Sequence, residues 1–214
     1  INNNKILMIS HLADIDGMGS VILGKYYFQD FDYLLADNNY DFDLETDIDA
    51  DAYDTIYICD LGFTDKNLQY CLSHPEIAKK IKHFDHHESE EFKNKYPFVN
   101  EIIKLGDHLT SATELFYTYL LTLPNSEFLR SNFFRKLVEA IRREDTWTFE
   151  EVNNTLGPDL ATLHAYLGAT SFINMMSNLD CSGDFYLPEV YEEIIKHQNA
   201  IKEADVANYV SKAR

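Results

Sequence analysis

Residues 5–17, with the sequence KILMISHLADIDG, decide the fold of this chain. The run begins with a short apolar segment, residues 5–9, and continues as a polar loop that ends in Gly17. This pattern is typical of a buried strand that leads into a loop. Residues 17–28 then place apolar side chains near helical spacing, so we expect the strand, loop and helix that begin an α/β unit.

The same alternation continues along the chain. Further strands are expected at residues 33–36, 55–59 and 81–84, with a candidate fifth at residues 98–103. Strands that alternate with helices predict a parallel arrangement in which successive helices cover the sheet. The fold class is therefore α/β, with a doubly wound, mainly parallel five-stranded sheet flanked by helices and a helical C-terminal part.

Helix signals follow the expected strands. Asp65 is expected to cap the helix after the third strand, and Ser111 and Glu114 have the spacing of a capping box. The acidic residues 37–54 are interpreted as a surface loop with room for one edge strand. The remaining helices are expected at residues 111–121, at residues 128–143 and, with intervening loops, from Pro158 onward.

Charge and cysteine content narrow the class of protein. The formal net charge is −18, whereas a protein that holds long nucleic acid through its phosphates is basic. The sequence lacks an apolar run of the ~18 residues that a membrane span needs, so no membrane partner is expected. Three cysteines, without a CxxC pair, indicate no disulfide framework and favour the cytoplasm.

Polar side chains follow three of the expected strands. His11, Asp14 and Asp16 follow the first strand, Asp60 follows the third, and residues 85–87 (DHH) follow the fourth. Ligands of a doubly wound sheet bind at the carboxyl ends of its strands, so these groups are expected to meet. Clustered carboxylates and imidazoles are stabilised by cations. The mixed set favours two divalent ions, foremost Mn²⁺, and leaves Mg²⁺, Zn²⁺ and Fe²⁺ open.

Each of these residues has a simpler interpretation when it is taken alone. An Asp after a strand, such as Asp60, is usually a turn former or a helix cap. Asp14 and Asp16 before Gly17 fit a plain turn, and a lone His11 fits a surface position. Because such clusters follow three different strands, we favour the interpretation that they form one shared site.

Four motifs resemble those of a known family. HLADIDG at residues 11–17, CDLG at 59–62 and FDHHES at 84–89 resemble the first three motifs of the DHH phosphoesterases. REDTW at residues 143–147 is similar to the fourth motif. The family includes RecJ-type exonucleases, nanoRNases, cyclic-dinucleotide phosphodiesterases and family II inorganic pyrophosphatases. The resemblance covers roughly residues 5–150.

The resemblance implies a two-metal site in which Asp60 bridges the ions. It also implies that Asp85 orients a histidine and that His87 contacts the scissile phosphate, which makes these two the catalytic side chains. His11 and Asp14 are separated by two residues, where some relatives have three. The implied metal ligands are His11, Asp14 and Asp60 for one ion and Asp16, Asp60, His86 and Asp145 for the other.

The resemblance further implies a catalytic core at residues 1–150, and residues 151–214 as its helical completion and the start of a linker. The glycine-rich substrate-binding domain of many relatives is not found in this sequence. The implied activity is hydrolysis of short oligonucleotides or dinucleotides by a metal-activated water. The alternatives are a cyclic-dinucleotide phosphodiesterase, then a pyrophosphatase, or a scaffold without activity. Homodimer formation is left open.

Three weaker signals lie near the fourth motif. Arg142 and Arg143 are interpreted as residues that favour a helix C-terminus, with phosphate binding as the alternative. Trp147 is expected to pack in the core, with stacking on a base as the alternative. Thr110, Ser111 and Thr113 open a helix whose N-terminus could bind phosphate, but we favour capping, which alone explains Ser111 and Glu114.

Overall fold

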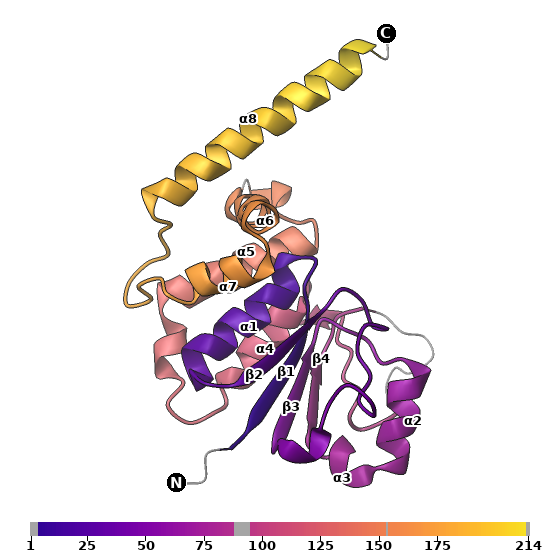
Figure 1. Ribbon diagram of the computed structural model, residues 1–214. Helices are drawn as coiled ribbons and strands as arrows, with labels where there is room; N and C mark the ends of the chain where they lie inside the picture. The colour runs from indigo at the N-terminus through magenta and orange to yellow at the C-terminus, as the bar shows by residue number, and fades with distance from the viewer. Residues whose placement is uncertain (1–3, 88–94, 153, 213–214) are drawn as a thin grey trace.

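The computed structural model describes residues 4–87, 95–152 and 154–212. Glu88 and Ser89, the last two residues of the third motif, lie outside the described residues. Four strands form a parallel sheet in the order β2-β1-β3-β4 (Figure 1). The strands are β1 (Ile6–His11), β2 (Asp32–Ala36), β3 (Thr55–Cys59) and β4 (Ile81–Phe84).

The chain leaves β1 and β3 toward opposite faces of the sheet. α1 (Ile15–Phe28) connects β1 to β2 on one face, and α2 (Asp65–Ser73) and α3 (Pro75–Ala78) connect β3 to β4 on the other (Figure 1). Because β1 and β3 are neighbours, their carboxyl ends form the point where the winding reverses. This point is where open α/β sheets place their ligands.

Alternate side chains of the strands supply two hydrophobic cores. Met8 and Tyr57 face the core that α1 covers, and Ile9 and Ile58 face the core that α2 covers. This period of two is the pattern of strands that are buried on both faces. The sheet is therefore held rigidly from both sides, which fixes the direction of the residues at its edge.

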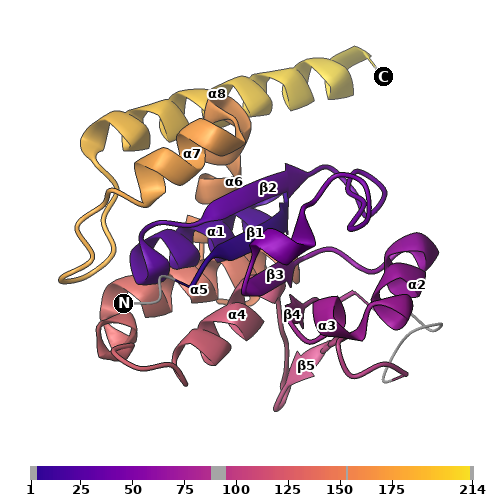
Figure 2. The same cartoon turned by 60° about the horizontal axis from the view of Figure 1, so that its bottom comes forward.

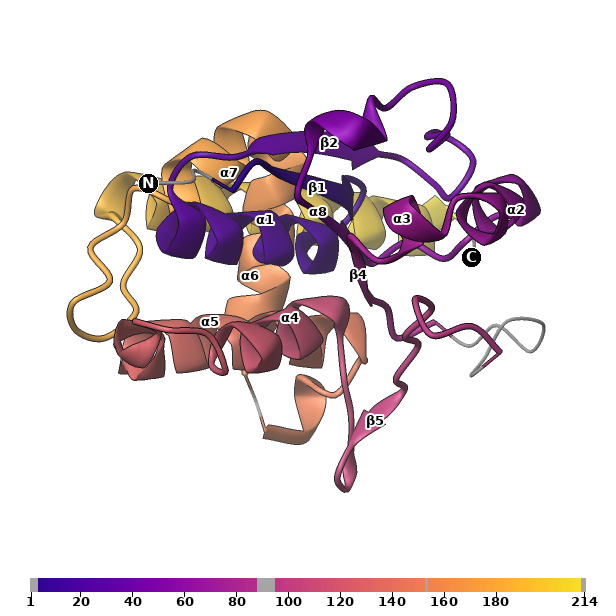
Figure 3. The ribbon, with the colours of Figure 1, turned by 90° about the horizontal axis from the view of Figure 1, so that it is seen from below.

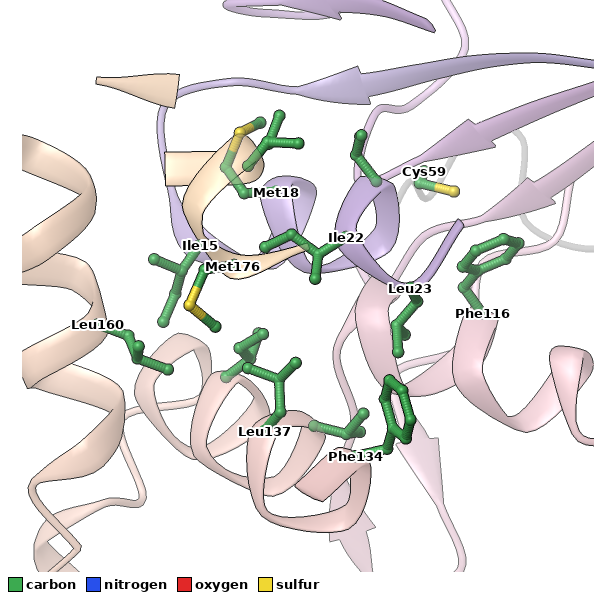
Figure 4. Close-up of a cluster of buried hydrophobic side chains, with 14 of the residues drawn as sticks. Ile15, Met18, Ile22, Leu23, Cys59, Phe116, Phe134, Leu137, Leu160 and Met176 are labelled. Carbon is green, nitrogen blue, oxygen red and sulfur yellow. The ribbon is translucent and has the colours of Figure 1, made fainter. Parts of the chain in front are cut away.

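The first core is thickened by a second layer of helices. α4 (Ala112–Leu120) and α5 (Asn132–Asp145) pack against α1, as seen from below in Figure 3. α6 (Leu156–Leu167) and α7 (Ala169–Met176) complete this layer. Figure 4 shows Ile15, Met18 and Ile22 of α1 gathered with Leu137 and Leu160 from α5 and α6.

The last helix, α8 (Glu189–Lys212), lies against α6 and then runs past it (Figures 1 and 2). Its side chains at Ile201, Val206 and Tyr209 are exposed. Among the described residues, no helix combines the length and the apolar character needed to cross a bilayer. Short elements complete the chain: η1 (Ala50–Ala52), η2 (Glu127–Arg130), η3 (Glu150–Val152), β5 (Lys104–Leu105) and β6 (His108–Leu109).

The expected α/β fold is confirmed, but the parallel sheet has four strands in the described part of the chain rather than five. Residues 98–103 contribute one isolated bridge, between Asp85 and Glu101. The backbone N–H of Asn100 donates to the side-chain atom Nδ1 of His83 in β4 rather than to a backbone carbonyl oxygen. Side-chain hydrogen bonds of this kind compete with a ladder, and they explain the missing strand.

Several element boundaries also differ from expectation. α1 begins at Ile15, two residues early, because Asp14 caps it. α2 is capped by Thr64, whose Oγ1 accepts from the N–H of Asn67, and Asp65 is its first residue. The loop at residues 37–54 contains the short helix η1 and, in its described residues, no strand. Ser131 separates η2 from α5 within the expected helix at 128–143.

Candidate metal centre

The tight connection from β1 to α1 brings His11 and Asp14 together. Asp14 Oδ1 accepts from the backbone N–H groups of Asp16 at 3.0 Å and Gly17 at 3.1 Å, which caps the helix. A Cβ atom at Gly17 would overlap the carbonyl group of His11. Glycine therefore allows the helix to start directly against the end of the strand.

His11, Asp14 and Asp60 form what we call the first subsite. Nδ1 of His11 lies 2.9 Å from Asp14 Oδ2 and 3.2 Å from Asp60 Oδ2, and Nε2 lies 2.9 Å from the carbonyl oxygen of Asp37. Since each neighbour is an acceptor, both ring nitrogens donate and the imidazole is cationic. Hydrogen bonds to Asp14 and Asp60 raise the pKa of His11 to about 10, although burial opposes them.

Asp60 lies between the two halves of the site. It follows β3 with φ 58°, a left-handed conformation that Asp tolerates better than most residues. Its backbone N–H donates to the carbonyl oxygen of Phe84 at 2.9 Å, which fixes it to β4. Oδ2 faces His11, and Oδ1 lies 3.5 Å from Nε2 of His86. The buried carboxylate can thus reach ions on both sides.

Asp16, His86 and Asp145 form the second subsite. Asp16 is fully buried, and its two oxygens accept from the N–H groups of Ala112 at 2.7 Å and Thr113 at 2.8 Å. These bonds fix the N-terminus of α4 to the start of α1. Burial and the negative charges of Asp60 and Asp145 raise the pKa of Asp16. A cation beside Asp16 would offset both effects.

His86 lies among three carboxylates of this subsite. Its Nε2 is 3.2 Å from Asp145 Oδ2, 3.5 Å from Asp60 Oδ1 and 3.6 Å from Asp16 Oδ2. Among the described residues, Nε2 of His86, Oδ1 of Asp60 and Oδ2 of Asp145 are buried without a well-formed hydrogen bond. Buried polar atoms that converge without bonding one another fit a site that an ion completes.

Titration of this group supports the same interpretation. Burial lowers the pKa of His86, but the surrounding carboxylates outweigh it and raise the value to about 9. Burial raises the pKa of Asp145 to about 7. With neutral imidazoles, the ionised carboxylates of Asp14, Asp16, Asp60 and Asp145 would carry four negative charges, which two divalent ions would neutralise. The donor set of carboxylate oxygens and imidazole nitrogens fits such ions.

Asp85 shapes the loop that carries His86 and His87. Its Oδ1 accepts from the backbone N–H of His86 at 2.9 Å and from Nδ1 of His87 at 2.8 Å. The bond to Asp85 raises the pKa of His87 to about 9, against the opposing effect of burial. The His87 side chain is 63% exposed, so a cationic imidazole stands at the open side of the buried cluster.

The structure thus brings the eight expected site residues together, and it adds neighbours that we did not expect. One of them is the carbonyl oxygen of Asp37, which bonds to His11. Asp37 directly follows β2, and β2 lies beside β1 in the sheet, so this contact follows from the strand order. His164 is buried, at 8% exposed; burial lowers its pKa, and the nearby charge of Asp14 opposes that shift. Ser111 does cap α4, as expected from its spacing to Glu114.

Trp147 of the fourth motif differs from its expected position, whereas Arg142, just before the motif, lies in the last turn of α5 as expected. Trp147 was expected in the core, but its side chain is 79% exposed because α5 ends at Asp145 and the chain turns outward. Arg142 is buried and bonds to Glu139 at 2.8 Å and to the carbonyl oxygen of Leu109 at 3.3 Å. These protein partners occupy its guanidinium group.

Comparisons with known proteins support the fold and do not bear on the function. No protein-family model matches the chain, and no curated protein sequence matches it significantly. The chain resembles the crystal structure of an uncharacterized protein from Helicobacter pylori G27, with a TM-score of 0.59 and 15% sequence identity. The similarity covers 94% of this chain and 71% of the other chain. At that identity, the likeness shows a shared α/β architecture.

Proposed function

We propose that this protein is a divalent-metal-dependent phosphodiesterase that hydrolyses short oligonucleotides, with two ions, foremost Mn²⁺, as cofactors. One observation carries most of the weight. Buried atoms of Asp60, His86 and Asp145 converge at the switch point of the sheet without satisfying one another. The resemblance of the motifs to DHH phosphoesterases supports the same reaction class.

The chain supplies a complete set of ligands for two ions. His11, Asp14 and Asp60 would hold one ion, and Asp16, Asp60, His86 and Asp145 would hold the other. When bound, the ions would activate a water and stabilise the charge that develops on the phosphate oxygens. The bond from Nε2 of His11 to the Asp37 carbonyl would keep Nδ1 directed at the site, as is usual for a ligating histidine.

His87 is suited to handle the substrate directly. Asp85 holds its Nδ1 and keeps the ring cationic at neutral pH, because the pKa of His87 is raised to about 9. The exposed imidazolium can donate a hydrogen bond to a phosphate oxygen, and it can supply a proton to the leaving oxygen. Asp85 therefore acts through His87, as a residue that positions it.

The charge of the protein favours a short substrate. A net charge of −18 opposes the binding of a long polyanion along the surface, so the metal centre itself must hold the phosphate. Dinucleotides and short oligonucleotides satisfy this condition. The cysteines at 59, 71 and 181 are unpaired, and we propose a cytoplasmic location for the enzyme.

A hydrolysis panel tests the proposal. The purified protein is incubated with Mn²⁺ and, separately, with a labelled dinucleotide, cyclic di-AMP and pyrophosphate, and each reaction is repeated with EDTA. We expect the dinucleotide to be cleaved in the presence of Mn²⁺ alone. Preferential cleavage of one of the other two compounds would replace the proposed substrate class. Inertness toward all three, without bound metal by elemental analysis, would indicate a scaffold protein.

A further inference from the structure

Trp147 occupies a backbone position where glycine is usual. It lies just beyond Thr146, the C-cap of α5, with φ 57°. Its N–H donates to the carbonyl oxygen of Glu144 at 3.1 Å, and the N–H of Thr148 donates to that of Arg143 at 2.8 Å. This pair of bonds is the Schellman motif, whose left-handed residue is normally Gly because a side chain is crowded there.

The indole of Trp147 makes few contacts with the protein that could offset this backbone strain. The side chain of Trp147 is largely exposed, with a tilted ring contact to Phe149 at 6.0 Å between centroids. The turn below it is firmly held, since Thr146 Oγ1 donates to the carbonyl oxygen of Arg142 and Arg143 Nη1 donates to that of Thr148. An exposed aromatic residue that is held in a strained backbone conformation indicates a role in ligand binding rather than in stability.

The position of this residue relates it to the metal centre. Trp147 follows Asp145 of the second subsite by two residues, so their Cα atoms lie within about 7.6 Å of each other. The neighbouring residues Arg142 and Arg143 both form ion pairs with Glu139. Their charges are therefore not free to bind a phosphate group of the substrate. The exposed indole therefore offers a neutral aromatic surface two residues beyond Asp145, a member of the second subsite.

We propose that Trp147 is a stacking platform for a nucleobase of the substrate, beside the scissile phosphate. This inference rests on the proposed function and adds the part of the substrate that the metal centre does not hold. Every base has a face that can stack on indole, so the platform selects nucleotides over other phosphodiesters without selecting a sequence. It supplies affinity that does not depend on a net positive charge, which this protein does not have.

Fluorescence tests the platform without any need for catalysis. Trp147 is the only tryptophan of the chain, so the indole emission reports this side chain alone. In the presence of Mg²⁺, which does not quench emission itself, we expect AMP to quench the fluorescence and ribose 5-phosphate to leave it unchanged. Equal effects of the two compounds, or no effect of AMP at millimolar concentration, would overturn the proposal.

Kinetics on two substrates separate stacking from general damage. For Trp147→Ala we expect KM for a dinucleotide to rise by about tenfold, the change that loss of one stacked base produces, with kcat nearly unchanged. Trp147→Phe should restore most of the affinity, and an abasic dinucleotide should be cleaved equally by all three proteins. Tyr186→Ala is the matched control, since Tyr186 is 74% exposed and lines a separate hollow with Leu187 and Ile195.

The outcomes distinguish the platform from the proposed function. If the dinucleotide is cleaved but Trp147→Ala affects the normal and abasic substrates alike, the platform is wrong and the phosphodiesterase stands. If no phosphodiester is cleaved and AMP still quenches selectively, the platform stands and the activity is wrong. Trp147→Gly should keep or raise the melting temperature, because it relieves the left-handed strain. A marked fall would show that the indole is structural and would overturn the platform.

Discussion

The first and second subsites share Asp60 and differ in how their other polar atoms are satisfied. In the first, His11 bonds to Asp14 and Asp60 through Nδ1 and to the Asp37 carbonyl through Nε2. In the second, Nε2 of His86 lies 3.2 Å or more from every carboxylate oxygen near it, without a well-formed hydrogen bond. We call the first subsite closed, because hydrogen bonds satisfy its imidazole, and the second open, because its buried atoms lack such bonds.

This difference predicts an order in which the two proposed ions would bind. An ion entering the first subsite must displace the proton of His11, whose pKa is raised to about 10 by its partners. An ion entering the second subsite instead relieves the repulsion among Asp16, Asp60 and Asp145. We therefore expect the second subsite to bind its ion more tightly, and the first subsite to fill at higher metal concentration or higher pH.

Removing the shared ligand should have the largest effect. Asp60→Asn keeps the shape of the side chain and its tolerance for the left-handed backbone, but it removes the charge that faces both ions. If the ions supply about 4 kcal/mol of transition-state stabilisation, hydrolysis should fall by about 10³-fold. Dinucleotide cleavage and the metal content after gel filtration measure the two losses.

The control for this variant is Asp51→Asn, which removes one charge at a side chain that is 87% exposed. It should retain both metal and activity. A cooperative thermal melt of Asp60→Asn in EDTA would show that the variant still folds. An active Asp60→Asn variant that still holds two ions would show that the subsites do not share this residue.

Asp145→Asn should open the second subsite alone. Asp145 Oδ2 is one of the buried atoms without a hydrogen bond, and its charged neighbour His86 lies 3.2 Å away as a second candidate ligand. We expect metal content to fall from two ions to one or fewer and activity to fall by more than about 100-fold, since loss of a ligand exceeds the cost of losing its outer partner. Full activity would show that the fourth motif is misassigned.

His11→Gln should weaken the first subsite with a smaller effect. The second subsite keeps all its ligands in this variant, so one tightly bound ion should remain. We expect the apparent Mn²⁺ affinity of the activity to fall by about 10–100-fold, with partial recovery at high Mn²⁺. A metal titration of activity measures this. If His11→Gln lost more metal than Asp145→Asn, the proposed order of the subsites would be reversed.

The sequence was sufficient to predict where the candidate metal-binding residues of the strand ends meet. Strand ends are marked by an abrupt change from apolar to polar residues, as at His11 and Asp60, and a parallel sheet puts such ends at one edge. The difference between the subsites was not predictable in this way. It depends on which carboxylate lies within hydrogen-bond distance of which imidazole, and those distances follow from tertiary contacts among segments that are far apart in the sequence.

The exposure of Trp147 was also not predictable from the sequence. Composition favours burial of a lone tryptophan, and the helical period of residues 128–143 indicates no direction for a residue beyond the end of that helix. Its exposure follows from the Schellman turn at Thr146, a feature that sequence marks only when glycine is present. The missing fifth strand has a similar cause, because the bond from Asn100 to His83 depends on tertiary contact.

The stability of the metal-free protein should depend on pH in a way that reflects the closed first subsite. The pKa of His11 is about 10 in the folded protein against an ordinary 6.5, so its contribution is complete below pH 6.5 and is lost as the pH rises toward 10. His86 and His87, with pKa values raised to about 9, act in the same direction. In EDTA, the melting temperature should therefore fall by several degrees between pH 6.5 and 9.

With saturating Mn²⁺ the sign should reverse over the same interval. The ligating imidazoles must be neutral to bind the ions, so metal affinity rises with pH and the bound ions stabilise the folded state more strongly. Thermal melts at pH 6.5 and 9, with EDTA and with Mn²⁺, give the four values required. In His11→Gln the fall in EDTA should be smaller than in the parent. An unchanged fall would place the titrating groups elsewhere and remove the distinction between a closed and an open subsite.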